Sequence, residues 1–160
     1  MRSRKSANAT AKTAAASLLA ILFMGAFRIP SLCAIQTDGF ASLQKTKRMA
    51  EAQHEIVVLL IKKKQYEEAA AGANKIFELK WTEDQEPLLV REMRNLTDQF
   101  LASGRASLGL QLVERNFGRF KRPSSRAALL KEMGYLHKKM NQPDKALDCF
   151  KKALNLEGGK

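Results

Sequence analysis

Residues 127–160 carry the pattern that most restricts the fold of this 160-residue chain. In the first half of this segment, apolar side chains recur at the spacing of one helix face, at Leu129, Leu130, Met133, Leu136 and Met140. Asn141-Gln142-Pro143 interrupts the period, and Pro143 suits the first turn of a second helix, where its missing N–H costs no hydrogen bond. Ser124 and Ser125 are predicted to cap the first helix, and Gly158-Gly159 to end the second. The segment therefore predicts a pair of antiparallel helices.

The small residues of this predicted pair are spaced as in a known family of repeats. Gly134 lies in the first helix, and the second carries Ala146, then Phe150 four residues later, then Ala153. In these positions the segment resembles a tetratricopeptide repeat. The resemblance implies that the two helices approach closely at Gly134, Ala146 and Ala153, and that Phe150 fills the space between neighbouring repeats.

Two upstream segments fit the same template, at residues 50–83 and 90–120. Ala69 and Gly109 take the place of Ala146 in these segments, so the three small residues stand 40 and 37 positions apart. The resemblance is closest in the last segment and weakest in the middle one.

One helical pair cannot bury its own apolar face, so pairs stack, and about three are the usual minimum. Lys63-Lys64-Gln65 and Ser103-Gly104 are the turns expected within the first two pairs. The predicted fold is all-α, with three stacked antiparallel helical hairpins over residues 41–160, a tetratricopeptide-like α-solenoid. A plain six-helix bundle is the alternative for the two weaker segments.

The beginning of the chain has the order of a secretory signal peptide. Residues 1–12 hold four basic side chains and no acidic one, and an apolar core follows over residues 14–27. This core is short for a membrane-spanning helix, which needs ~20 apolar residues. We predict cleavage after Ala34, which divides the chain into a signal segment, 1–34, and a repeat domain, 35–160.

Two alternatives place the same segment in a membrane. The core could remain as an uncleaved anchor that extends across Arg28 to Leu32. Cys33 resembles the lipid-bearing cysteine of a bacterial lipoprotein signal, although Leu32 stands where that family has a small residue. The predicted location is secreted, periplasmic or otherwise extracytoplasmic, with membrane attachment only if the signal is uncleaved or Cys33 is lipidated.

The chain is basic, with 28 Lys and Arg against 16 Asp and Glu, a formal charge of +12. Residues 1–34 contribute five of the basic side chains and no acidic one, so a charge of +7 remains on the repeat domain. Such a charge favours acidic partners. Nucleic acid is not expected, because aromatic residues are not interleaved with the basic ones and the chain is predicted to be exported.

No catalytic or cofactor site is predicted. The glycines do not form a phosphate-binding loop. His54 and His137 are far apart in the sequence and lack the further ligands that a metal needs. Cys149 has no neighbouring base to activate it and is expected to be a small buried side chain. The chain is therefore predicted not to be an enzyme, and no metal or cofactor is expected.

The tetratricopeptide resemblance implies a binding groove, because in that family the first helix of each pair lines a concave surface. The side chains that it assigns to the groove in the second and third pairs are Arg91, Arg94, Lys131, Tyr135 and Lys138. In the first pair they are His54, Val58 and Ile61. A groove that is apolar at one end and basic at the other suits an extended peptide with acidic groups.

The predicted function is a protein–protein interaction or scaffold module that binds a protein or peptide partner, an acidic one by the charge, through this groove. The alternative is a structural subunit of an envelope complex that packs through apolar end faces. Candidates for these faces lie around Leu43, Met49 and Ile56 at one end and around Leu154 and Leu156 at the other. Self-association through the C-terminal end is also predicted.

Overall fold

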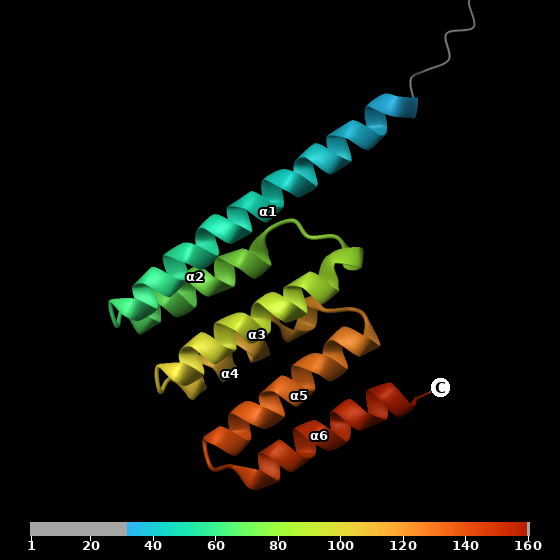
Figure 1. Ribbon diagram of the computed structural model, residues 1–160. Helices are drawn as coiled ribbons and strands as arrows, with labels where there is room; N and C mark the ends of the chain where they lie inside the picture. The colour runs from blue at the N-terminus through green and yellow to red at the C-terminus, as the bar shows by residue number, and fades with distance from the viewer. Residues whose placement is uncertain (1–31, 160) are drawn as a thin grey trace, which may run out of the picture. The chain divides into compact units, whose positions relative to one another are not determined.

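The structure is a computed structural model that describes residues 32–159, and this part contains helices and connecting turns but no strand. Its helices are, in chain order, α1 (Leu32–Lys62), α2 (Tyr66–Glu78), α3 (Glu86–Ala102), α4 (Ala106–Asn116), α5 (Pro123–Lys139) and α6 (Pro143–Gly158). Two short 3₁₀ helices, η1 (Glu83–Gln85) and η2 (Phe117–Arg119), precede α3 and follow α4. The all-α fold of three helical hairpins is confirmed (Figure 1). The predicted signal core, 14–27, lies outside the described residues.

The turns inside the three hairpins are the same structure. Each has one residue of positive φ at the equivalent position, and these residues are Lys64, Gly104 and Asn141. In each turn the next backbone N–H donates to the carbonyl five residues earlier, from Gln65 to Leu60, from Arg105 to Phe100 and from Gln142 to His137. This 6→1 bond is the Schellman ending of a helix. Residues 40 and then 37 positions apart are therefore structurally equivalent in the three hairpins.

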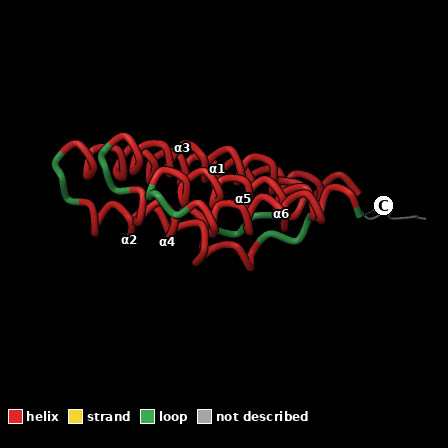
Figure 2. The backbone as a smooth tube through the Cα atoms, turned by 90° about the horizontal axis from the view of Figure 1, so that it is seen from below, coloured by secondary structure: helices red, strands yellow, loops and turns green. Residues whose placement is uncertain are grey.

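The hairpins stack in chain order and form two layers. Contacts join α3 to α5 and α2 to α4, so first helices pack against first helices and second helices against second helices. Figure 2 shows the helix axes lying nearly along one direction. The main core lies between the layers and includes the fully buried Ile76, Met93, Leu96, Phe100 and Leu129.

Two glycines permit the close approach of helices. A Cβ on Gly134 would lie 2.7 Å from Cε1 of Phe150, so the aromatic ring of α6 rests directly on the backbone of α5. A Cβ on Gly109 would lie at an ordinary contact distance, 3.5 Å, from Cα of Thr97 on α3, and these two residues are equivalent to Ala146 and Gly134 in the last hairpin. Ala146 and Ala153 are buried on α6 beside the same interface.

The start of α5 differs from the sequence prediction. The helix begins at Pro123, and the preceding Arg122 offers no side-chain cap. Ser124 and Ser125, expected as caps, lie inside the first turn, and Ser125 is buried. Pro123 occupies the first helical position, where its fixed φ suits the helix and its missing N–H leaves one fewer donor unsatisfied.

The first helix also begins earlier than expected. It starts at Leu32 rather than at Ala41, because no proline intervenes and Gly39 costs a helix only about 1 kcal/mol. The predicted cleavage position after Ala34 thus falls in the first turn of α1. Within the described part, none of the helices has the length and apolar content needed to cross a membrane.

Candidate protein-binding groove

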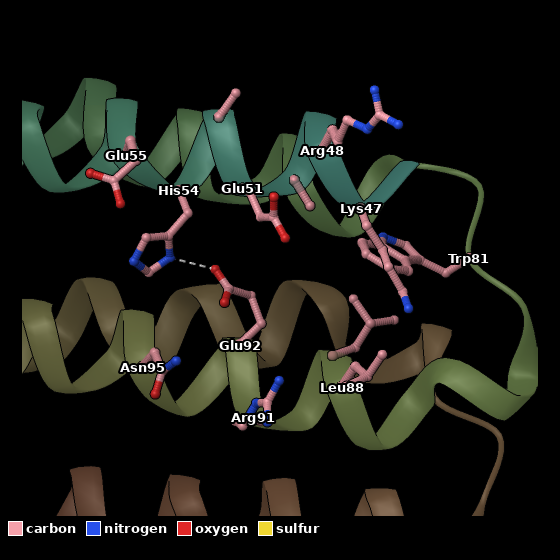
Figure 3. Close-up of a pocket in the computed structure, with 13 residues that line it drawn as sticks. Lys47, Arg48, Glu51, His54, Glu55, Trp81, Leu88, Arg91, Glu92 and Asn95 are labelled. Carbon is pink, nitrogen blue, oxygen red and sulfur yellow. Dashed lines mark hydrogen bonds and ion pairs between the residues drawn. The ribbon is translucent and has the colours of Figure 1, made fainter. Parts of the chain in front are cut away.

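A groove of about 630 Å³ lies between α1 and α3, the first helices of the first two hairpins (Figure 3). Its polar and aromatic lining comes from Lys47, Arg48, Glu51, His54, Glu55, Trp81, Arg91, Glu92 and Asn95, and Leu88 and Leu89 add apolar surface. Three acidic side chains balance three basic ones, so the groove as a whole is not basic. Its character therefore depends on how these charges are distributed along it.

A polar bridge between the hairpins lies toward one end of the groove. Nδ1 of His54 on α1 lies 2.6 Å from Oε1 of Glu92 on α3, and the two side chains are both half-buried. Figure 3 shows this pair spanning the space between the helices.

The other end offers an aromatic and apolar surface beside positive charge. Trp81, in the connection between α2 and α3, donates from Nε1 to the carbonyl oxygen of Ile76 at 2.7 Å, which fixes the position of the indole. Lys47 of α1 and Leu88 of α3 belong to the same lining and are drawn toward this end of the groove in Figure 3. Leu88 is more than a third exposed although it is apolar. This end can accept an apolar side chain with an acidic group close by.

The contact between α3 and α5 is polar and contains the carboxylate of Glu132. Oγ1 of Thr97 donates to Oε1 of Glu132 at 2.7 Å, and Nε of Arg94 lies 3.8 Å from Oε2 of the same carboxylate. Burial raises the pKa of Glu132, against the opposing effect of the Thr97 hydrogen bond. Arg94, a predicted groove residue, is thus partly neutralised by an acid of its own chain.

The predicted groove residues of the third hairpin are not part of the groove lining, and two of them contact α6. Lys131 pairs with Glu157 at 2.7 Å, and the ring of Tyr135 meets that of Phe150 edge to face with centroids 5.2 Å apart. Both partners belong to α6. Lys138 is exposed in the last turn of α5. Of the five predicted side chains, only Arg91 lines the groove between α1 and α3.

The first hairpin supplies groove residues that the sequence prediction did not contain. Lys47 and Trp81 line the groove, whereas Ile61, assigned to it by the resemblance, is buried in the core. Ile61 is the next-to-last residue of α1 and belongs to the core cluster that also contains Ala69 and Ala73 of α2. The one tryptophan of the chain, in a connection between two helical pairs, was the available signal for Trp81.

Metal binding and thiol chemistry find no support in the described residues. No group of three His, Cys, Asp or Glu side chains there is close enough to hold a metal ion. Cys149 is buried on α6, and burial, with a smaller contribution from Asp148, raises the pKa of its thiol. A thiol in this state is a poor nucleophile near neutral pH.

Comparison with known proteins identifies one segment of the chain. Residues 127–158, the α5–α6 hairpin, match the family model described as tetratricopeptide repeat. No curated protein and no solved structure matched the chain.

Proposed function

Because residues 127–158 are a tetratricopeptide repeat, we propose that the groove between α1 and α3 binds an extended peptide segment of a protein partner. Repeats of this family are protein-interaction scaffolds. The three hairpins share one turn structure and one register, so the groove belongs to the same scaffold as the matched repeat.

The Trp81 end of the groove carries the proposal. A fixed indole and the exposed Leu88 form an apolar seat, with the ammonium of Lys47 and the guanidinium of Arg91 in the same lining. A peptide with an acidic residue next to an apolar one fits this arrangement. The apolar side chain would rest on the indole, and the carboxylate would meet the two cations.

The groove contains its own reporter, since Trp81 is the one tryptophan in the chain. A random peptide display library can be selected against the full chain, and enriched peptides titrated by tryptophan fluorescence. We expect Asp or Glu beside Leu, Phe or Ile, and binding at least about tenfold weaker to Lys47→Glu/Arg91→Glu, equivalent to about 1.4 kcal/mol.

The matched control is Lys75→Glu/Lys151→Glu, which makes the same charge change at exposed positions on α2 and α6. It should bind the enriched peptides as the unchanged chain does. Peptides that bind all three proteins equally, or without a change in Trp81 fluorescence, would place the binding surface elsewhere.

We further propose that the repeat domain works outside the cytoplasm, on the basis of the signal-like order of residues 1–34. These residues can be fused to a phosphatase that folds only in an oxidising compartment. Activity is expected, and Leu18→Arg/Leu22→Arg, which interrupts the apolar core, should abolish it. An inactive fusion with the unchanged segment would refute export.

A further inference from the structure

Apolar side chains are exposed at both ends of the stack of hairpins. On α1 they are Met49, Ile56 and Leu59, here called the N-terminal face. On the last hairpin they are Leu147 and Leu154 of α6, here called the C-terminal face. Large apolar side chains grouped on an otherwise charged helical surface mark an interaction site.

The exposed positions of α1 have structural equivalents in the first helices of the later hairpins. Comparison with these equivalents shows what covers such a position inside the stack. Ile56 is equivalent to Leu96 of the second hairpin, and the exposed fractions of these side chains are 48% and 0%. Both hairpins have a second helix of their own and a hairpin that follows. They differ, within the described residues, in that only the second has a hairpin before it. The preceding hairpin therefore buries this position.

Each of the two remaining N-terminal positions is apolar and buried in one of the later hairpins, whereas in the other hairpin an exposed polar side chain stands there, Gln99 or Arg126. Leu59 is 54% exposed, whereas its equivalent in the third hairpin, Leu136, is 1% exposed. Met49 is exposed, and its equivalent Leu89 is buried. At these apolar positions the outer surface of α1 thus corresponds to surface that α3 or α5 buries against a preceding hairpin.

The C-terminal face is the other half of that interface. Leu154 is 63% exposed, whereas its equivalent in the first hairpin, Phe77, is 3% exposed beneath the hairpin that follows. Leu147 is exposed, and its equivalents Ala70 and Leu110 pack against the main core. The last hairpin therefore exposes the surface that, in the earlier hairpins, is covered by the hairpin that follows.

We propose that a second copy of this chain stacks head to tail on the first, with its N-terminal face against the C-terminal face of its neighbour. The proposal rests on one observation: the contact between the two copies would continue the two interfaces that already join the hairpins within one chain. One chain carries both complementary halves, so no different partner is needed. Such an interface joins unlike surfaces, and it extends into longer assemblies unless the rotation between copies closes a ring. It is independent of peptide binding in the groove.

The test uses two variants of the full chain that each lose one face. Ile56→Glu/Leu59→Glu blocks the N-terminal face, and Leu147→Glu/Leu154→Glu blocks the C-terminal face. Sedimentation velocity across the micromolar to millimolar range gives the mass of each protein alone and of their equimolar mixture. We expect the unchanged chain to grow beyond a dimer, both variants to stay monomeric, and the mixture to form a one-to-one dimer that grows no further.

Three results would overturn the proposal. The unchanged chain could remain monomeric over the whole range. Alternatively, the first variant could dimerise alone, which would indicate a two-fold contact through α6, or the second could dimerise alone through α1. The control Ala71→Glu/Gln111→Glu adds the same charge at equivalent exposed positions in the middle of the stack and should assemble as the unchanged chain does.

All four proteins should give the same helix content by circular dichroism. If a glutamate variant unfolds, the corresponding double glutamine variant replaces it, because glutamine removes the apolar surface at little cost in helix propensity.

Discussion

The side-chain amide of Asn116 donates a hydrogen bond to the side-chain oxygen of Asn74 at 2.8 Å and so joins α4 to α2 inside the protein. The same amide also donates to the carbonyl of Leu112, and that of Asn74 donates to the carbonyl of Ala70. Both side chains are buried. The pair thus holds two second helices in register through a fully satisfied polar contact.

Replacement of Asn116 by alanine should lower the free energy of unfolding by about 1–3 kcal/mol, because the buried oxygen of Asn74 loses its donor. Urea denaturation measures this loss. Asn74→Ala in the same background should then cost less than it does alone, since the two residues interact. The exposed Asn95 provides a control, and an Asn116→Ala loss no larger than that of Asn95→Ala would contradict the structural role.

Addition of a single methyl group at Gly134 should destabilise the last hairpin. Gly134→Ala places a Cβ 2.7 Å from the Phe150 ring, and overpacking of this kind costs about 1–3 kcal/mol. Thermal denaturation should show a lower midpoint, whereas Gly118→Ala, which meets no atom within 4 Å, should not lower it. Phe150→Leu should be tolerated better in the Gly134→Ala background than in the unchanged chain. Equal costs in the two backgrounds would show that the ring does not set the limit.

Glu86 makes the free energy of unfolding depend on pH. Burial by itself would raise the pKa of Glu86, but hydrogen bonds from the backbone of Lys121 and Arg122 and from the Ser125 hydroxyl lower it below 4.5. The two backbone donors lie 2.6 and 3.0 Å from the carboxylate and fix the loop before α5. A lowered pKa means that the ionised group stabilises the folded state above its unfolded pKa, and that this contribution is lost as the pH falls through the folded value.

The stability difference between the unchanged chain and Glu86→Gln should therefore be constant at neutral pH and shrink below about pH 4.5. Urea denaturation over a series of pH values measures it. Glu83→Gln, at an exposed position in η1, should show no such difference. A difference between the chain and Glu86→Gln that grows on acidification would have the wrong sign for a lowered pKa.

The thiol of Cys149 should react slowly while the protein is folded. Its burial and raised pKa leave little accessible thiolate, so iodoacetamide in mildly alkaline solution should modify Cys149 much more slowly in buffer than in denaturant. Peptide mapping by mass spectrometry follows this residue separately from Cys33. Equal rates under the two conditions would place Cys149 on an accessible surface.

The hairpins themselves could be predicted from local patterns. Apolar residues at helical spacing indicated the helices, and the breaks at Lys63-Lys64-Gln65, Ser103-Gly104 and Asn141-Gln142-Pro143 coincide with the observed turns. The match of residues 127–158 to the tetratricopeptide repeat confirms the resemblance where it was closest. The start of α5 was predicted wrongly: the serines were expected to precede the helix as caps, but the helix already begins at Pro123 and contains them.

The candidate groove was predicted only in outline. Arg91 and His54 lie in its lining, whereas Lys47, Trp81 and Glu92 were not foreseen. The family resemblance places first helices along a surface, but it does not determine how far each side chain reaches or which neighbour it meets. Arg94 and Lys131 are cationic in the sequence, yet they lie beside Glu132 and Glu157 once the helices are packed.

The secondary structure, the number of hairpins and the small residues at their contacts follow from the amino-acid sequence, because helix period, turn chemistry and side-chain volume act over a few neighbouring positions. The pairs His54 with Glu92, Asn74 with Asn116 and Glu86 with the loop before α5 emerge only in the folded chain. These residues are far apart in the sequence, and they meet because of the offset and angle at which one hairpin stacks on the next. That geometry comes from the packing of whole helix faces.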